Sequence, residues 1–499
     1  MTVVGWEAHL PPDLRREDLD LTAKASLPSA WKAVWASAPS APILFDRERG
    51  WMAAEQLEEA TRRVAGRLQG AGLEPGDRML FSAEPSLELV VAHVAALRSG
   101  IVVVPMNTAY REREVTHVVT DSRPRAALVD DPDRAGWVRA AAEPETVVVG
   151  PGVDLPDREP AVLDAAAPGD PALLGYTSGT TGSPKGAVLT HANLLAGSES
   201  VGLAWRWTAS DRLVLALPLF HAHGLCVGLH GTLLAGASAV LLPRFDVDAV
   251  LDAAGDQEAT LFFGVPTMYH RLAQSARVGE LARLRLCVSG SAPLPAELHR
   301  TLAERGGQQV LERYGMTETL MNVSNPYDGE RRAGSVGLPL PGVELRLSGG
   351  EEGEIQLRGP NVFGGYWERP KATAESFDDG WFRTGDLGGL DPDGYLRILG
   401  RSKELIISGG FNVYPREVED VLLGHPGVAE VAVVGTPSDE WGEVVTAFVV
   451  PAAERPAADV LIAFAAERLA GFKRPRVVHF VDTLPRNALG KVLKHELKS

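Results

Sequence analysis

The sequence has few of the cysteines that form disulfides or bind zinc in small domains. It contains only two cysteines, Cys226 and Cys287, among 499 residues. We therefore expect a reducing compartment and no disulfide framework. No paired Cys-x-x-Cys and no His-Glu-x-x-His pattern occurs, so neither a structural nor a catalytic zinc site is indicated.

Long apolar runs and an excess of positive charge are also missing. The run "GIVVVPM" at residues 100–106 is far too short to cross a bilayer, and no secretory leader pattern opens the sequence. The formal net charge is −16 at pH 7, which argues against non-specific binding to nucleic acid. We expect a soluble, cytoplasmic protein with small-molecule partners and neither a nucleic-acid nor a membrane partner.

What the sequence does contain is enough apolar residues for a large core, arranged in alternating strand and helix patterns. The hydrophobic fraction is 45%, and the length exceeds that of one ordinary domain. A strand at 78–82, a helix at 86–98 and a strand at 101–104 form the first such unit. Repeated βα units predict an α/β fold with a largely parallel sheet flanked by helices. The same alternation predicts strands at 213–217, 239–242, 260–263 and 309–311, and helices at 224–234, 247–253 and 295–305.

The pattern changes twice in the second half of the chain. Between residues 334 and 359, short alternating runs with Gly-Pro turns predict a small antiparallel, β-rich subdomain. Beyond residue 400 we expect a separate small α+β domain. Its predicted elements are helices at 415–423 and 457–469 and strands at 428–434, 444–450 and 477–481.

The stretch "TSGTTGSPKG" at residues 177–186 combines glycines, hydroxyls and one lysine. Glycines let backbone amides converge on an anion, and Lys185 adds a compact positive charge. The stretch is not a Walker A loop, because Pro184 precedes the lysine and Gly186 follows it. Its composition indicates a polyphosphate loop, with a solvated polar turn as the alternative. Just beyond it, Thr190 is placed to cap a helix that begins at His191.

This loop resembles the phosphate loop of the adenylate-forming superfamily, which includes acyl-CoA synthetases, peptide-synthetase adenylation domains and luciferases. Five further motifs of that superfamily follow in order. The resemblance implies an ATP-dependent, AMP-forming acyl-CoA ligase that works through an acyl-adenylate and uses ATP, Mg²⁺ and CoA. The motifs are "SGSAPL" (289–294), "ERYGMTET" (312–319), "RTGDLG" (383–388), "GRSKELI" (400–406) and "PRNALGK" (485–491).

The resemblance also implies roles for individual residues. Tyr314 would lie against adenine, Asp386 and Arg401 would bind the ribose hydroxyls, and Lys491 would meet the reacting carboxylate and the α-phosphate. The expected catalytic residues are Lys491, Glu318, Thr177 and His221, with Glu318 and Thr177 holding the metal. The expected nucleotide-binding residues are Thr177, Ser178, Gly179, Thr180, Thr181, Gly182, Lys185, Ser291, Ala292, Pro293, Glu312, Arg313, Tyr314, Gly315, Met316, Thr317, Asp386 and Arg401.

A division into domains follows from the same resemblance. We expect a large N-terminal domain at 1–400, a hinge at 401–403 centred on Lys403, and a small mobile lid at 404–499. The lid would rotate between the two half-reactions, because Lys491 would otherwise crowd the incoming thiol. After rotation, Ser408, Gly409, Gly410 and Lys473 would meet CoA.

Residues 312–347, together with "FFGVPTMYHRLA" and "RLRLCVSGSAPL", are most like the malonyl-CoA synthetase branch. A second substrate carboxylate needs a cation, because a buried charge must be paired. Arg244 is the first choice and Arg285 the reserve, with His221 bordering the acyl pocket. For Arg244, a surface pair with Asp246 is the alternative.

Other substrates stay open. The stretch "RSKELIISGGFNVYPREVED" looks more like general fatty-acyl and aryl-CoA ligases, so a medium-chain acyl or aryl acid is the alternative to malonate or methylmalonate. A non-catalytic nucleotide-binding homologue is disfavoured by the intact motif residues Lys185, Glu318 and Lys491. A metal at His221 and His223 lacks a third ligand.

Overall fold

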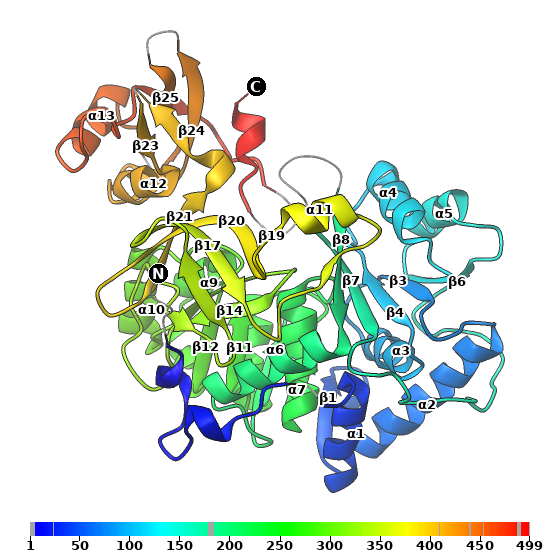
Figure 1. Ribbon diagram of the computed structural model, residues 1–499. Coiled ribbons are helices and arrows are strands. Elements are labelled where there is room, and N and C mark those ends of the chain that lie inside the picture. Colours follow the sequence, from blue (N-terminus) through cyan, green and yellow to red (C-terminus); the bar gives the residue numbers. More distant parts are fainter. Residues whose placement is uncertain are drawn as a thin grey trace. The chain divides into compact units, whose positions relative to one another are not determined.

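The computed structural model describes residues 5–22, 24–177, 184–408, 410–438, 441–452, 454–486 and 491–498. Its chain forms two compact units. Figure 1 colours the chain along the sequence and labels the helices and strands. The larger unit comprises Val3–Leu345 and Leu357–Phe382, and the smaller comprises Arg346–Gln356 and Arg383–Ser499. The proposed hinge at 401–403 stays a prediction.

The larger unit holds a nine-stranded sheet in the order β15-β14-β13-β12-β11-β9-β10-β1-β2. Strands β1 and β9 to β13 pair in parallel, and β2, β14 and β15 pair antiparallel. The bounds are β1 Pro42–Asp46, β2 Gly50–Ala53, β9 Arg212–Leu215, β10 Ser238–Leu241, β11 Leu261–Gly264, β12 Leu286–Ser289, β13 Leu311–Met316, β14 Leu320–Ser324 and β15 Leu338–Pro339.

A second, seven-stranded sheet of the same unit has the order β18-β8-β7-β4-β3-β5-β6. Strands β3 to β7 are parallel, and β8 and β18 continue the sheet antiparallel. The predicted βα units are therefore confirmed, but they divide between two sheets. The bounds are β3 Arg78–Ser82, β4 Val102–Pro105, β5 Ala126–Val129, β6 Val147–Val149, β7 Pro171–Thr177, β8 Lys185–Thr190 and β18 Gly365–Tyr366.

Helices cover these sheets. They are α1 Leu27–Ser37, α2 Ala54–Gly70, α3 Leu87–Arg98, α4 Glu112–Ser122, α5 Pro132–Ala141, α6 His191–Ala204, α7 His230–Ala235, α8 Val247–Asp256, α9 Pro266–Gln274, α10 Ala296–Gly306 and α11 Pro370–Glu375. Short 3₁₀ turns are η1 Glu7–His9, η2 Arg16–Asp18 and η4 Val278–Arg283. Helix α3 is buried on almost every side, which explains its apolar residues all round.

Helix α6 joins the two sheets. It begins as predicted, because the Thr190 hydroxyl accepts from the Asn193 amide at 3.1 Å, which satisfies a free helix N–H. The helix contacts β8 of one sheet and β14 of the other, and Figure 1 shows it among these strands. Both faces of the helix are therefore covered, and it fixes the two sheets against one another.

Two predicted elements differ in detail. The helix expected at 224–234 is a π-helical segment, η3 His223–Leu229, followed by α7. Such wide turns are frequent at functional sites. The strand expected at 309–311 overlaps only the first residue of β13, because the chain stays irregular up to Val310.

The antiparallel region predicted at 334–359 is part of a larger five-stranded sheet in the order β16-β17-β20-β19, with β21 paired to β20. Of these strands, only β16 and β17 lie within the predicted range. Strand β20 runs antiparallel to both β19 and β21. The bounds are β16 Glu344–Leu347, β17 Glu352–Arg358, β19 Phe377–Asp378, β20 Trp381–Leu390 and β21 Leu396–Arg401.

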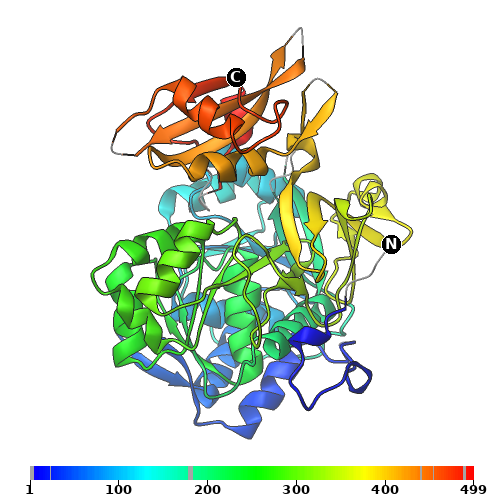
Figure 2. The same cartoon turned by 90° about the vertical axis from the view of Figure 1, so that its left-hand side faces the viewer.

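The C-terminal part of the smaller unit is the predicted α+β fold, drawn in orange and red in Figure 2. Its core includes Ile406, Val418, Val433 and Leu461, which come from strands and helices alike. Helix α12 has the predicted bounds, and strands β24 and β25 are longer than predicted. The elements are η5 Ser402–Glu404, β22 Ile406–Ser408, β23 Phe411–Val413, α12 Pro415–Leu423, β24 Val428–Ser438, β25 Gly442–Pro451, α13 Ala458–Ala466, β26 Val477–Phe480 and η6 Lys494–Leu497.

None of the helices in the described ranges is both long enough and apolar enough to span a membrane.

Candidate active site

The predicted phosphate loop connects β7 to β8. The two strands are antiparallel, with Tyr176 opposite Gly186 and Thr177 opposite Lys185. The base of the loop thus places the Thr177 hydroxyl and the Lys185 ammonium group on paired positions. The predicted loop residues Ser178, Gly179, Thr180, Thr181 and Gly182 lie outside the described residues.

Helix α4 holds both ends of this loop. The Tyr176 hydroxyl donates to Asp121 Oδ2 at 2.8 Å, and His117 Nε2 donates to the Pro184 carbonyl oxygen at 2.7 Å. Burial and the Asp121 carboxylate raise the pKa of Tyr176, so its hydroxyl keeps the proton that it donates. Asp121 also forms an ion pair with Arg369. Both strands next to the loop are therefore fixed by side chains of one helix.

The motif "ERYGMTET" forms the end of β13 and the turn into β14. Gly315 is required there, because a Cβ would lie 2.1 Å from the Leu320 carbonyl oxygen. A Cβ at Gly175 on β7 would lie 2.3 Å from Thr317 Cγ2. Thr317 therefore packs against β7, two residues before Thr177. The nucleotide motif and the phosphate loop, which are far apart in sequence, meet at this point as the resemblance implies.

Glu318 is the expected metal ligand. Its side chain is 5% exposed, and its Oε1 accepts from the Tyr366 hydroxyl at 3.1 Å. A buried carboxylate fits Mg²⁺, which binds through one or two carboxylates together with substrate phosphate oxygens. In the described ranges, no group of three or more His, Cys, Asp or Glu side chains could hold a metal by itself. Phosphate oxygens would complete the coordination.

The segment "SGSAPL" follows β12 directly. Ser291 has φ +68°, a left-handed conformation that is uncommon for a residue with a side chain and typical of functional sites. Glu312 fixes the segment, since its Oε1 accepts from the Leu294 amide at 2.9 Å. Ala292 and Pro293, which lie between, are at least partly exposed. Glu312 thus supports the chain that we predicted to line the nucleotide site.

Arg313 has surroundings that its motif did not predict. Its side chain is 3% exposed, and its Nε and Nη2 atoms have no hydrogen-bond partner in the part of the chain that the structure describes. Burial lowers the pKa of Arg313 to about 9, so the guanidinium is still charged at neutral pH. A buried cation with unused donors is costly unless an anion joins it.

Two histidines are influenced by the charge of Arg313. Burial and the Arg313 charge lower the pKa of His221 to about 4 and that of His223 well below its usual value. Both imidazoles are therefore neutral at pH 7. His223 is buried, its ring nitrogens have no partner in the described ranges, and it stacks on Phe263 with ring centroids 6.2 Å apart. This pair provides neutral N–H donors within the electrostatic influence of the Arg313 cation.

The two arginines that we predicted for the substrate carboxylate have other surroundings. Arg285 binds Asp211 at two points, Nε to Oδ1 and Nη2 to Oδ2, both at 2.6 Å. Its remaining N–H groups donate to the carbonyls of Trp205 and Arg206. Its donors are thus used inside the fold, and it holds the chain after α6. Arg244 is exposed.

In the smaller unit, the two predicted ribose-binding residues are neighbours. Asp386 and Arg401 are register partners in the β20–β21 pair, and Arg401 Nε lies 3.0 Å from Asp386 Oδ1. The sequence motifs that carry them are therefore brought together by a hairpin. Asp386 is buried, while Arg401 is partly exposed.

Lys491 belongs to the same neighbourhood. Withdrawal from bulk water lowers its pKa, the positive charge of Arg401 lowers it further, and Asp386 and Glu404 act in the opposite direction. The ends of its motif are fixed by a bridge between Arg486 and Val492. The three residues predicted to act on ribose, α-phosphate and carboxylate thus form one charged cluster.

The expected hinge and CoA residues are spread over the same unit. Lys403 lies in η5 and is exposed. Ser408 is buried at the end of β22, and Gly410 has φ +83°, which favours glycine. Lys473 Nζ donates to both oxygens of Glu417 at 2.7 Å. Gly409 lies outside the described residues. Their roles stay predictions.

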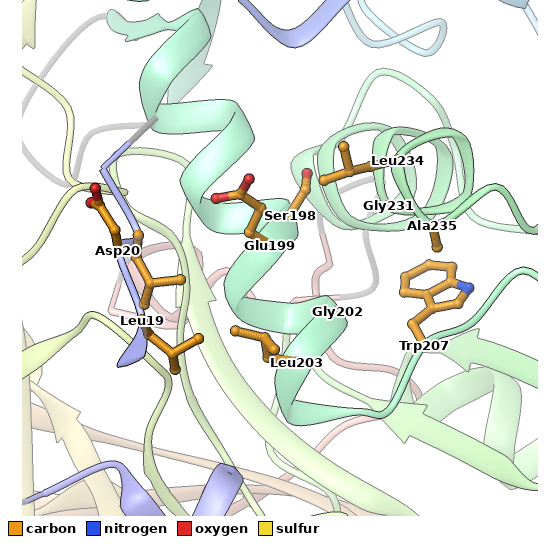
Figure 3. Close-up of a pocket in the computed structure, with 11 residues that line it drawn as sticks. Leu19, Asp20, Ser198, Glu199, Gly202, Leu203, Trp207, Gly231, Leu234 and Ala235 are labelled. Carbon is orange, nitrogen blue, oxygen red and sulfur yellow. The ribbon is translucent and has the colours of Figure 1, made fainter. Parts of the chain in front are cut away.

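A separate pocket of about 340 Å³ lies elsewhere in the larger unit. Figure 3 shows Glu199 and Leu203 on α6, with Leu19 on one side and Trp207 on the other. Burial and the Asp20 carboxylate raise the pKa of Glu199. The pocket includes none of the residues that the motifs assign.

Comparison with known proteins now identifies the family. The model of the AMP-binding enzyme family matches residues 31–367, and the model of the AMP-binding enzyme C-terminal domain matches residues 417–491. The chain belongs to the AMP-binding enzyme family. The two matched ranges include all the motifs found in the sequence except "RTGDLG" and "GRSKELI", which lie between them.

Similar proteins include ligases for different acids. The chain is 41% identical to a feruloyl-CoA synthase of an Amycolatopsis species over 458 residues, covering 89% of this chain and 92% of the relative. It is 37% identical to the malonate–CoA ligase of Arabidopsis thaliana over 484 residues, covering 86% and 79%. The crystal structure of ATP-bound MatB from Rhodopseudomonas palustris matches with a TM-score of 0.88 and 41% identity, covering 94% and 98%.

These matches confirm the resemblance inferred from the motifs. The chain is an AMP-forming acyl-CoA ligase, an enzyme that joins a carboxylate to CoA, and ATP and CoA fit it as substrates. The mixed α/β class is confirmed as well. The relatives differ in the acid that their names give, so the family alone leaves the carboxylate open.

Proposed function

We propose that the acid is malonate, or its methyl derivative, and that the product is the corresponding acyl-CoA. The observation that carries the proposal is the buried, charged Arg313 with unused Nε and Nη2 donors. Malonate has a second carboxylate that does not react, and that group needs a cation once it leaves water. A guanidinium is suited to it, because its planar fork can bind a carboxylate at two points.

The two histidines within the electrostatic influence of Arg313 support the same choice. Neutral His221 and His223 add N–H donors without a competing negative charge, since their pKa values are lowered by burial and by Arg313. The similarity to the malonate–CoA ligase of Arabidopsis thaliana also supports it. This proposal moves the carboxylate-binding role from Arg244 and Arg285 to Arg313, which the motif had suggested only as a nucleotide-site residue.

An aryl acid is the second candidate, because the feruloyl-CoA synthase of Amycolatopsis is 41% identical to the chain. An aromatic monocarboxylate would bury apolar surface at the site. It would leave the Arg313 guanidinium without an anion, at a cost of several kcal/mol. Malonate is therefore favoured.

In the first half-reaction, a malonate carboxylate oxygen attacks the α-phosphorus of ATP, and pyrophosphate leaves. The enzyme contributes positioning and charge stabilisation. Lys185 and the loop amides would bind the phosphates of the leaving group. Lys491 would offset charge at the reacting carboxylate and the α-phosphoryl oxygens. Mg²⁺, held by Glu318 and the Thr177 hydroxyl, would supply positive charge to the phosphates.

In the second half-reaction, the CoA sulfur attacks the acyl carbon of the adenylate as its thiol proton is lost, and AMP leaves with the electrons of the broken C–O bond. Asp386 and Arg401 would hold the ribose of the adenylate. Ser408, Gly410 and Lys473 are the proposed contacts of CoA on the smaller unit.

The substrate is tested by ATP–pyrophosphate exchange with malonate, methylmalonate, octanoate, benzoate and ferulate at equal concentrations. We expect the highest kcat/KM with malonate or methylmalonate. Exchange that is fastest with ferulate or octanoate would contradict the malonate assignment. No exchange with any acid, while MgATP still binds, would favour the non-catalytic alternative.

The role of Arg313 is tested by Arg313→Gln. We expect kcat/KM for malonate to fall by roughly 10²-fold or more, as for loss of a buried charged partner, with a much smaller change for benzoate. Arg244→Ala tests the alternative that Arg244 binds the second carboxylate of malonate. If Arg244→Ala loses activity with malonate specifically and Arg313→Gln does not, Arg244 is the carboxylate-binding residue. Arg300→Ala, an exposed arginine on α10, is the matched control.

A further inference from the structure

A short segment, Phe363–Trp367, connects parts of the site that belong to different sheets. Its strand β18 pairs with β8, so that Tyr366 lies opposite Ala187, and the Trp367 amide donates to the Gly186 carbonyl at 2.8 Å. At its other end, the Phe363 amide donates to the Glu318 carbonyl at 2.9 Å. The main chain of this segment is thus fixed both at the phosphate loop and at the expected metal ligand.

The side chain of Tyr366 makes the same connection. Its hydroxyl donates to Glu318 Oε1 at 3.1 Å, and the Lys185 ammonium lies 5.3 Å from the centroid of its ring. An aromatic face attracts a cation, and a hydroxyl can donate to a carboxylate. Phe363 packs edge-on against the ring, with centroids 4.9 Å apart. Tyr366 therefore contacts the negative Glu318 carboxylate through its hydroxyl and the positive Lys185 ammonium through the face of its ring.

We propose that Tyr366 is a positioning residue for MgATP, which sets the Glu318 carboxylate toward the metal and the Lys185 ammonium toward the phosphates. The hydroxyl bond fixes the rotation of the Glu318 carboxylate, and the ring face limits the directions open to the flexible Lys185 chain. This inference rests on the proposed roles of Glu318 and Lys185, and it does not depend on which acid the enzyme uses.

The two contacts can be removed separately. Tyr366→Phe deletes only the hydroxyl and keeps the ring under Lys185, whereas Tyr366→Leu deletes both. The measurement is calorimetric binding of α,β-methylene-ATP, which cannot be cleaved at the reacting bond, once with Mg²⁺ and once with EDTA. No carboxylate is present, so the choice of acid does not enter. Thermal unfolding of each variant checks that the fold is retained.

We expect Mg²⁺ to tighten binding of the analogue to the unmodified enzyme. In Tyr366→Phe this gain in affinity should be roughly tenfold smaller, the size expected for loss of a hydrogen bond to a charged group. Binding in EDTA should be unchanged in Tyr366→Phe and weaker in Tyr366→Leu. In ATP–pyrophosphate exchange, Tyr366→Phe should raise the Mg²⁺ concentration needed for half-maximal rate and leave the KM of the acid unchanged.

Two controls make the result specific. Tyr110→Phe removes a hydroxyl from another partly buried tyrosine and should behave as the unmodified enzyme. In a Glu318→Gln background, Tyr366→Phe should cause no further loss of the Mg²⁺ gain. An equal loss with Mg²⁺ and with EDTA, or an undiminished loss in the Glu318→Gln background, would overturn the proposal. If the Glu318→Gln single variant keeps the whole gain in affinity that Mg²⁺ gives the unmodified enzyme, both the proposal for Tyr366 and the metal role of Glu318 are overturned. The malonate assignment would be unaffected by that result.

Discussion

At the scale of single residues, Gly290 and Arg313 act as a pair. An ideal Cβ at position 290 would lie 2.2 Å from Arg313 Cζ, which no real Cβ tolerates. The guanidinium thus lies in space that only a glycine leaves open. Because this glycine is in the motif "SGSAPL", the motif sets the position of a charge as well as the course of the chain.

We therefore expect Gly290→Ala to displace the Arg313 guanidinium. The kcat/KM for malonate should fall by at least about tenfold, the loss expected when a hydrogen bond to a charged group is disturbed. Exchange with benzoate should change less, because benzoate lacks the second carboxylate. ATP–pyrophosphate exchange with both acids measures the difference.

Gly136→Ala is the matched control, since a Cβ there meets no atom within 4 Å and the residue lies inside α5. That substitution should be neutral or slightly stabilising. An equal loss of malonate and benzoate activity in Gly290→Ala would contradict a carboxylate-specific effect and indicate a general distortion of the segment.

At the scale of helices and strands, two buried histidines link α3 to α7, and a third is buried at the start of α6. His93 on α3 and His230 on α7 are hydrogen-bonded through their Nε2 atoms at 2.8 Å, so one imidazole donates and the other accepts. Burial lowers the pKa of His93 to about 3 and that of His191 at the start of α6 to about 4. Packing of these helices therefore requires neutral imidazoles.

This requirement predicts acid lability of the fold. The unfolded chain binds these protons near the ordinary pKa of 6.5, while the folded chain does not. The stabilisation is complete above pH 6.5 and is lost as the pH falls toward 4, by up to about 1.4 kcal/mol per pH unit for each histidine. The melting temperature measured between pH 7.5 and pH 5 should fall accordingly.

His93→Gln tests the source of this effect, because glutamine can still bond to His230 and does not titrate. The decrease of melting temperature between pH 6.5 and pH 5 should be shallower in His93→Gln. His495→Gln, at an exposed position, should leave the slope unchanged. The same slope in all three proteins would show that His93 does not contribute.

At the scale of the whole molecule, the proposed reaction uses residues of both units. Lys185, Glu318 and Arg313 belong to the larger unit, while Asp386, Arg401 and Lys491 belong to the smaller. In this proposal adenylation requires Lys491, which offsets charge at the attacked α-phosphorus. Thioester formation does not require it, because the lid is proposed to rotate and carry Lys491 away before the thiol enters.

Lys491→Ala should therefore reduce adenylation by roughly 10²–10⁴-fold, as expected when one electrostatic group at the transition state is removed. Thioester formation from supplied acyl-adenylate should survive. Pyrophosphate exchange measures the first step, and acyl-CoA formation from the adenylate and CoA measures the second. Lys371→Ala, at a highly exposed lysine, is the control. Equal losses in both steps would contradict the assignment.

The sequence by itself determined many of the helices and strands, the order of the motifs and the family. Strand β3 and helix α12 have the predicted bounds, and Thr190 caps α6 as expected. These features depend on residues a few positions apart: periodicity, capping hydroxyls and glycine turns are local. The meeting of Asp386 with Arg401 was also within reach, because fifteen residues form a simple hairpin.

Only the tertiary structure decided how the strands divide between two sheets and which charges meet. Arg285 is bound by Asp211, seventy-four residues away, and Tyr366 meets Glu318 across forty-eight residues. Sequence patterns show that an arginine or a tyrosine is present, but whether its donors are already used depends on distant partners. Arg313 follows the same rule, since its burial and its unused donors arise from packing between separate segments.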